Sequence, residues 1–142
     1  MNKVQVKKFI FDVSRLSIPV IFCDTKNKEW NFLSDHVAWT SPKNEIVINK
    51  VKWVDLSLND KYIVILHEIG HLKDKTDYYS STVKREFFAQ AWALNKSKRL
   101  KIKGLYSHAK KIFRAWEIFF EWNSDHRRYV LASRLARKKG LI

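Results

Sequence analysis

Residues 57–73 read SLNDKYIVILHEIGHLK, and this stretch decides how the rest of the chain is interpreted. Ser57 and Asn59 are both residue types that cap the first turn of a helix, and Asp60 suits the positive end of a helix dipole. Residues 62–66, which follow, are apolar on every side, as is typical of a helix that is buried all round. We therefore expect a buried helix that begins near Ser57 and carries the pentapeptide HEIGH.

This pentapeptide, residues 67–71, places two histidines four positions apart. On a strand such positions lie roughly 13 Å apart, whereas on a helix they are one turn apart, at roughly 6 Å. Two imidazoles can share one metal ion only if their nitrogens come within about 2 Å of it. Only the helix permits this, so we expect His67 and His71 to bind one metal ion. Glu68 then projects beside the metal, where it can take a proton from the water that the metal activates.

Two histidines leave a catalytic zinc site one protein ligand short. A second helix is expected from Val83 to about Ser97, and four of its residues share one face: Glu86, Ala89, Gln90 and Ala93. The small alanines would let this helix pack closely against the first one, and Gly70 would serve the same approach. We therefore expect Glu86 to be the third ligand of a Zn²⁺ ion. Two other carboxylates with shorter reach are rivals for this role: Asp74 and Asp77.

The rest of the chain predicts an α+β fold. Residues 3–16 have apolar residues near helical spacing. Three short runs rich in apolar and β-branched residues predict the strands of a small sheet: 20–23, 37–40 and 45–49. After the two metal-binding helices, further helices are expected over 108–122 and from Asp125 to about Lys139, with Gly140 as the stop. We expect one compact domain over residues 1–100 and a basic helical extension over residues 101–142 that packs on it.

Composition supports a single globular domain without disulfides. The chain has 142 residues, of which 46% are hydrophobic, so a sizeable core is expected and disorder is not. Only 3 Gly and 2 Pro are present, which argues against an all-β barrel. The single Cys23 excludes an internal disulfide framework and fits a reducing compartment. No apolar run approaches the roughly 20 residues that span a bilayer, so we expect a cytoplasmic monomer that does not enter membranes.

Positive charge is concentrated in the second half of the chain. The formal net charge is +14; residues 1–71 carry 10 basic and 8 acidic groups, and residues 72–142 carry 18 and 6. Such density can hold phosphates by counterion release, although it also keeps a small protein dispersed without any specific partner. The candidates for nucleic-acid contact lie in the last expected helix: Arg127, Arg134 and Lys138.

The HEIGH pentapeptide followed by Glu86-Phe87-Phe88-Ala89-Gln90-Ala91-Trp92-Ala93 resembles the HExxH and ExxA signature of the gluzincin zinc metallopeptidases. The match covers roughly residues 37–97 and is most similar to minimal single-domain members and to the ImmA/IrrE group, which is linked to phages and mobile elements. Gln90 stands where this family usually has Asn or Asp. The resemblance implies zinc held by His67, His71 and Glu86, with Glu68 as the general base.

The same resemblance implies a zincin-like fold whose edge strand receives an extended protein or peptide substrate. We expect this edge to be residues 45–49, with substrate contacts from the β-branched run Ile46, Val47 and Ile48. A second group should stabilise the oxyanion. The candidates are Tyr78, Tyr79, Tyr106 and His108, of which Tyr79 and His108 are preferred.

Two alternatives to this endopeptidase remain open at the level of the sequence. SprT-like proteases, which degrade protein crosslinked to DNA, complete the HExxH motif with a downstream histidine, and His108 invites that comparison. The other alternative is a basic nucleic-acid-binding protein whose metal site is structural or silent. The identity of the substrate does not follow from the residues.

Overall fold

The computed structural model describes residues 1–75, 81–120 and 126–142. In chain order its elements are α1 (Lys3–Ser14), β1 (Val20–Cys23), the 3₁₀ helix η1 (Lys28–Leu33), β2 (Ala38–Thr40), β3 (Ile46–Asn49), α2 (Lys50–Trp53), α3 (Leu58–Lys73), α4 (Thr82–Leu100), α5 (Leu105–Phe119) and α6 (Arg127–Lys138). The fold is α+β, with several helices around a small mixed sheet. Within the described residues, no helix is both long and apolar enough to cross a membrane.

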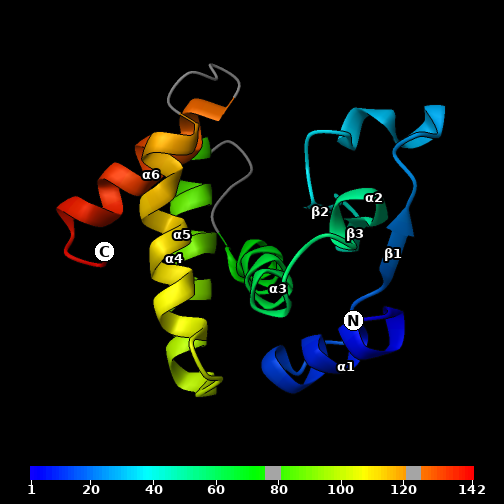
Figure 1. The fold of residues 1–142 in the computed structure, drawn as a ribbon, viewed down its shortest axis with the longest axis horizontal. Coiled ribbons are helices and arrows are strands. Elements are labelled where there is room, and N and C mark those ends of the chain that lie inside the picture. The colour runs from blue at the N-terminus through cyan, green and yellow to red at the C-terminus, as the bar shows by residue number, and fades with distance from the viewer. Residues whose placement is uncertain (76–80, 121–125) are drawn as a thin grey trace.

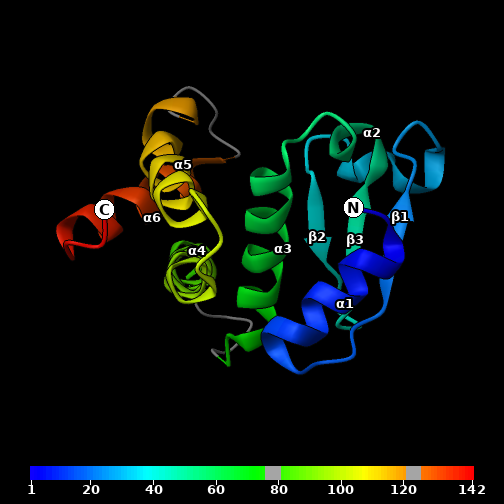
Figure 2. The ribbon, with the colours of Figure 1, turned by 60° about the horizontal axis from the view of Figure 1, so that its bottom comes forward.

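The elements form two halves that meet at α3 and α4. The sheet half, residues 1–75, contains the sheet, α1, α2 and α3; the helical half comprises the described residues from Ser81 onward, with α4, α5 and α6 (Figure 1). Viewed from a second direction, α3 stands between the sheet and α4, and α1 runs in front of the sheet (Figure 2). A shared core runs through both halves and includes Ile10, Ile65, Leu66 and Phe113, all with exposed fractions of 0%.

Most of the expected elements are confirmed. The N-terminal helix, the three strands and both helices that carry the proposed ligands are present, and Ser57 is the residue that caps α3. α5 begins at Leu105 rather than His108, because Gly104 adopts a left-handed conformation (φ 74°) that ends the connection from α4 just before it. The helix ends at Phe119, with Phe120 as its cap, rather than near Trp122, and the expected Asp125 cap lies outside the described residues. No expected element corresponds to η1 or α2.

The strand order corrects the expectation about the sheet edge. The order is β1-β3-β2, with β1 parallel and β2 antiparallel to β3. β3 is therefore paired on both sides, and the expectation that residues 45–49 form the open edge is wrong. The expected substrate contacts on β3 are wrong for the same reason, because Ile46, Val47 and Ile48 are 0%, 1% and 0% exposed. A run of consecutive apolar β-branched residues is typical of a strand covered on both faces.

α3 and α4 pack at backbone distance. A Cβ atom built on Gly70 would lie 2.5 Å from the carbonyl oxygen of Ala89 and 2.7 Å from its Cα. Ala89 and Ala93 are fully buried at this contact. The close approach expected from these small residues is therefore confirmed. This close approach brings the side chains of α4 that face α3 within reach of the histidines.

Candidate metal centre

The two histidines of the motif come together on α3. Ser57 Oγ accepts a hydrogen bond from the Asp60 backbone N–H at 3.1 Å, which satisfies one of the free donors at the start of the helix. From this start, the helix places His67 and His71 one turn apart on the side that faces α4. Their rings meet edge to face, and the two Nε2 atoms are 3.1 Å apart.

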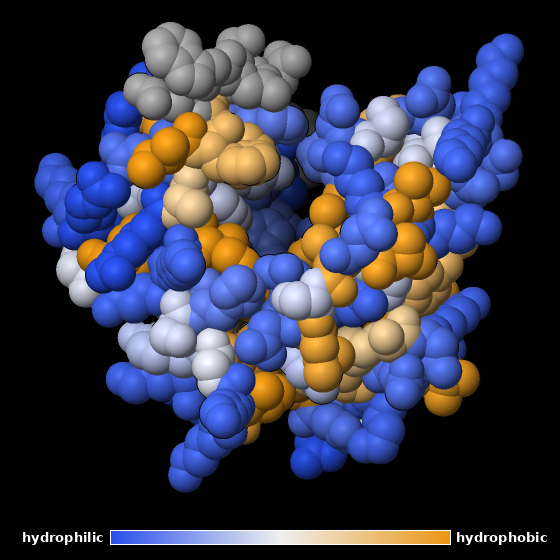
Figure 3. All heavy atoms as spheres, viewed as in Figure 1, coloured by the Kyte–Doolittle hydropathy of each residue, from blue (hydrophilic) through white to orange (hydrophobic). Residues whose placement is uncertain are grey.

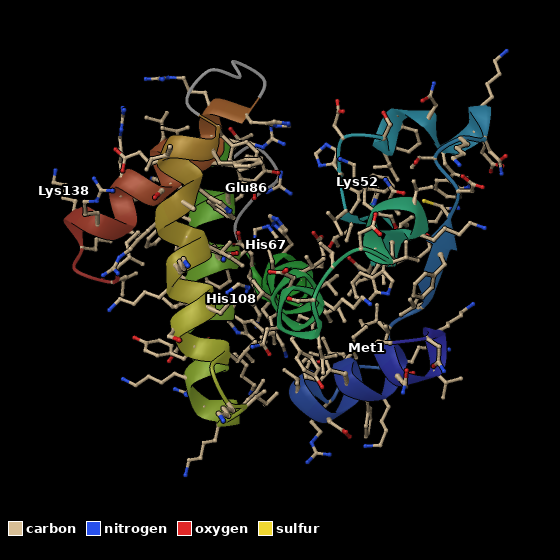
Figure 4. All side chains as sticks on the ribbon, viewed as in Figure 1. Met1, Lys52, His67, Glu86, His108 and Lys138 are labelled. Carbon is tan, nitrogen blue, oxygen red and sulfur yellow. The ribbon has the colours of Figure 1, made fainter. Side chains whose placement is uncertain are left out.

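Glu86 of α4 completes a group of three ligand atoms. Its Oε2 lies 3.1 Å from His67 Nε2, and its Oε1 lies 3.4 Å from His71 Nε2. Two ligands bound at about 2.0–2.1 Å around a tetrahedral ion lie about 3.3 Å from each other. Each of the three contacts is close to this separation, and one ligand atom from each residue lies within 4.8 Å of the other two, so the group could hold one such ion. Figure 4 shows His67 and Glu86 between the two halves of the molecule, and the rival Asp74 is not part of the group.

Gln90, one turn beyond Glu86, orients the first histidine. Its Oε1 lies 2.8 Å from His67 Nδ1, so the hydrogen-bond network assigns a proton to Nδ1, and the amide oxygen accepts it. In neutral His67 the lone pair is then on Nε2, which faces His71 and Glu86. An outer partner of this kind holds a metal-binding histidine in the required tautomer. Gln90, which departs from the usual residue of the resembled family, supplies this partner here.

Electrostatics favour positive charge at this point. Burial by itself lowers the pKa of His67. The hydrogen bond with the adjacent Glu86 carboxylate, and its negative charge, outweigh burial and raise this pKa to about 9. Burial likewise raises the pKa of Glu86, but contacts with His67 and His71 outweigh it and hold this pKa well below its usual range. Glu86 Oε2 is also buried without a well-formed hydrogen bond in the described residues. A cation would satisfy this oxygen and replace the proton on His67, so the donor set fits a metal ion.

The candidate general base lies beside this group. Glu68 is only 7% exposed, and Thr40 Oγ1 donates a hydrogen bond to its Oε2 at 2.7 Å. Thr40 belongs to β2, one of the two edge strands, so the sheet holds the carboxylate in one orientation. No local motif in the sequence indicated Thr40, because its contact with Glu68 joins residues 28 positions apart.

A cleft of about 640 Å³ lies over the three ligands and Glu68. Figure 3 shows the surface hollowed between the two halves, with apolar residues beside the hollow. On the sheet side the cleft is lined by η1, β2 and the turn after β2; on the helical side it is lined by α4 and α6. The sequence did not indicate the residues that α6 contributes, Arg128 and Tyr129.

Tyr129 is tied to the ligands through a chain of aromatic contacts. Its ring meets Trp116 edge to face at 5.0 Å, and Trp116 meets His67 in the same way at 5.7 Å. Arg128 Nη2 donates to Tyr129 Oη at 3.2 Å, and Arg128 Nε is 3.8 Å from Glu86 Oε1. Burial, followed by the negative charge of Glu86, raises the pKa of Tyr129 to about 12, so the phenol keeps its proton at neutral pH.

The other candidate residues do not join the cleft in the described chain. His108 lies 2.6 Å from Asp60 and lines a separate hollow with Ser57 and Gly104. Tyr79, the second preferred oxyanion stabiliser, lies outside the described residues, as does the rival ligand Asp77. The three candidates for nucleic-acid contact are exposed on α6: Arg127, Arg134 and Lys138.

Comparisons with protein-family models, with curated proteins and with solved structures give no match to this chain.

Proposed function

We propose that the protein is a zinc-dependent endopeptidase of the zincin type, in which His67, His71 and Glu86 hold the metal ion. The observation that supports this most strongly is the convergence of the three ligand atoms within 4.8 Å of one another, with the buried Glu68 next to them in the chain. The SprT-like alternative is less well supported, because it needs a third histidine and His108 contacts Asp60 instead.

A zinc ion, when bound, supplies Lewis acidity, which lowers the pKa of water toward about 7 and polarises a carbonyl group. Glu68 accepts the proton that the attacking water loses and passes it to the nitrogen of the leaving amine. Thr40 keeps the Glu68 carboxylate in place by donating to Oε2. In neutral His67, Gln90 accepts from Nδ1 and so leaves the lone pair of Nε2 available to the metal ion.

The edge strand β2 is the proposed binding site for the peptide backbone. The backbone groups on either side of β2 form hydrogen bonds with the strand β3 and the residue before it. The Val37 carbonyl accepts from the Asn49 N–H, and the Ser41 N–H donates to the Glu45 carbonyl. In an antiparallel ladder of this register, the backbone groups of Ala38 and Thr40 face away from β3. An extended substrate can pair with them as an added strand. Because Thr40 also contacts Glu68, a peptide bound there lies next to the general base.

Tyr129 is the proposed oxyanion donor, in place of Tyr79 and His108. Tyr129 lines the cleft, and Arg128 donates to its phenolic oxygen, which leaves the phenolic proton for another acceptor. A preorganised neutral donor stabilises negative charge that develops on a carbonyl oxygen.

The test compares the wild type with Glu68→Gln on an unfolded protein substrate, with cleavage followed by mass spectrometry and zinc measured in the same samples. Glu68→Gln should abolish cleavage and keep about one zinc per chain. The matched control is Glu117→Gln, since Glu117 contacts Arg134 and lies outside the cleft; it should cleave normally. Equal cleavage by wild type and Glu68→Gln, or a folded wild type that takes up no zinc, would contradict the proposal.

A further inference from the structure

The outer surface of the helical half carries charge of one sign. Every exposed charged side chain in residues 81–120 and 126–142 is a lysine or an arginine. The two carboxylates described there are largely covered: Glu86 belongs to the metal centre, and Glu117 contacts both Arg134 and Arg137. The sheet half differs, because exposed carboxylates lie among its lysines: Asp12, Glu29, Asp35 and Asp55.

Six of these basic residues lie between the C-terminal end of α4 and the middle of α5: Lys98, Arg99, Lys101, Lys103, Lys111 and Arg114. We call them the hairpin cations. The two helices pack side by side, with the rings of Phe87 and Phe113 6.5 Å apart. With 19 and 15 residues, α4 and α5 are about 28 and 22 Å long. Four of the hairpin cations lie within residues 98–103, at the turn end of this support, and Lys111 and Arg114 continue the positive charge along α5 by about 9 and 14 Å.

We propose that the hairpin cations form a surface that binds nucleic acid through its phosphate backbone. A duplex carries one negative charge per about 1.7 Å of its axis, so it can meet positive charges along a whole helix at once, whereas a small anion meets only a few. A membrane is the less suitable partner, because it requires apolar side chains interleaved with the charges. On the exposed side of α5, Ser107, Lys111 and Arg114 follow one another, and the large apolar residues that are exposed, Ile118 and Phe119, lie at the far end of the helix.

This inference does not rest on the proposed peptidase function, because none of the hairpin cations lines the cleft over the metal group. The three candidates for nucleic-acid contact that the sequence suggested, Arg127, Arg134 and Lys138, lie on α6, where Arg134 is engaged with Glu117 at 3.1 Å. The structure favours the hairpin instead.

The test measures fluorescence anisotropy of a labelled DNA duplex of about 30 base pairs at a series of salt concentrations between about 50 and 200 mM. Two variants with the same change of net charge are compared. The first reverses four hairpin cations: Arg99→Glu, Lys103→Glu, Lys111→Glu and Arg114→Glu. The control reverses four exposed lysines of the sheet half: Lys7→Glu, Lys26→Glu, Lys43→Glu and Lys52→Glu.

The wild type should bind with an affinity that falls steeply with salt. The hairpin variant should lose more than about 10-fold in affinity, and its salt slope should decrease by about 3 to 4, since each lost phosphate contact removes about 0.9. The control variant should stay within about 3-fold of the wild type. Circular dichroism checks that both variants fold. If the fourfold hairpin variant does not fold, the single changes Lys103→Gln and Lys111→Gln replace it and should each give a smaller decrease in the salt slope.

Three results would overturn the proposal. The first is no DNA binding by the wild type at low salt. The second is an equal loss in the two fourfold variants, which would mean that overall charge and not this surface attracts DNA. The third is sedimentation of the wild type with phosphatidylserine vesicles in the absence of DNA binding, which would identify a membrane as the partner.

Discussion

The sheet half and the helical half contribute to the cleft in different ways. The sheet half supplies both histidines and the proposed general base, Glu68, from a single helix, together with Thr40 from the neighbouring edge strand. The helical half supplies one ligand from α4, and Arg128 and Tyr129 from α6, which are far from that ligand in the sequence. The residues from α3 lie within five positions of one another in the sequence. The residues from the helical half come together only because its helices pack against one another.

The proposed metal centre therefore forms only where the two halves meet, between α3 and α4. α3 alone can present two imidazoles, but the third ligand, the partner of His67 Nδ1 and the phenol arrive only when the helical half is docked. Docking depends on the small residues at Gly70 and Ala89, where the two backbones touch. Changes that weaken the junction should therefore weaken metal binding as well as stability.

The largest effect is expected from removing the ligand that the helical half provides. Glu86→Gln keeps the size of the side chain but loses its charge, and zinc affinity should fall by more than about 100-fold, because even outer partners of ligands contribute 10- to 100-fold. Zinc affinity is measured by competition with a chelator. Glu117→Gln removes the other described carboxylate of this half and should leave zinc affinity unchanged. If Glu86→Gln also binds zinc like the wild type, the third ligand lies elsewhere.

The next effect tests whether α6 takes part in the chemistry. Tyr129→Phe removes only the hydroxyl, and we expect turnover to fall by about 100-fold, as is usual for the loss of one oxyanion donor, with zinc content unchanged. Tyr106→Phe is the matched control, since Tyr106 packs against the core and does not line the cleft. Normal turnover of Tyr129→Phe would remove α6 from the mechanism and leave the helical half with the ligand alone.

A third change acts on the joint between the halves. Alanine is the better helix former by about 1 kcal/mol, yet Gly70→Ala should reduce the free energy of unfolding by about 1–3 kcal/mol, because its Cβ meets the Ala89 backbone. Urea unfolding of the metal-free protein measures this. The reverse change at the exposed Ala115, Ala115→Gly, shows the ordinary propensity cost of about 1 kcal/mol. A more stable Gly70→Ala protein would mean that the halves are not in close contact.

The smallest effect concerns a second link between the halves, the Asp60–His108 contact from α3 to α5 at 2.6 Å. Burial raises the pKa of Asp60, but the hydrogen bonds with His108 and Ser57 outweigh it and lower this pKa. A lowered carboxyl pKa stabilises the fold above the pKa of the unfolded chain, and this stabilisation is lost as the pH falls through the lowered value. Asp60→Asn should cost no more than about 1 kcal/mol near neutral pH.

Thermal unfolding over a pH series checks this last expectation. The wild type and Asp60→Asn should differ near neutral pH and converge in strong acid, where Asp60 is protonated in both states of the wild type. A difference that grows as the pH falls would have the wrong sign for the proposed contact.

Much of the fold could be predicted because its signals are local. The β-branched runs, the Ser57 cap and the i, i+3, i+4, i+7 face of α4 each depend on residues within a few positions of one another. The start of α5 was missed because the left-handed Gly104, and not the apolar spacing, determines where the connection ends. The strand order could not be read in the same way, since a run such as Ile46 to Ile48 indicates burial but not which neighbour covers each side.

The sequence by itself determined that this chain carries a pair of histidines at helical spacing, a carboxylate between them and a second carboxylate on a face with small residues. It also determined the excess of positive charge in the second half. The packing of distant elements was needed to show that β2 and not β3 is an edge strand, that Thr40 contacts Glu68 and that Tyr129 lines the cleft. It also showed that the exposed charged side chains described in the helical half are all positive. The physical reason is that hydrogen bonding within a helix and burial patterns depend on nearby residues, whereas strand order, cleft walls and surface charge depend on which distant elements pack together.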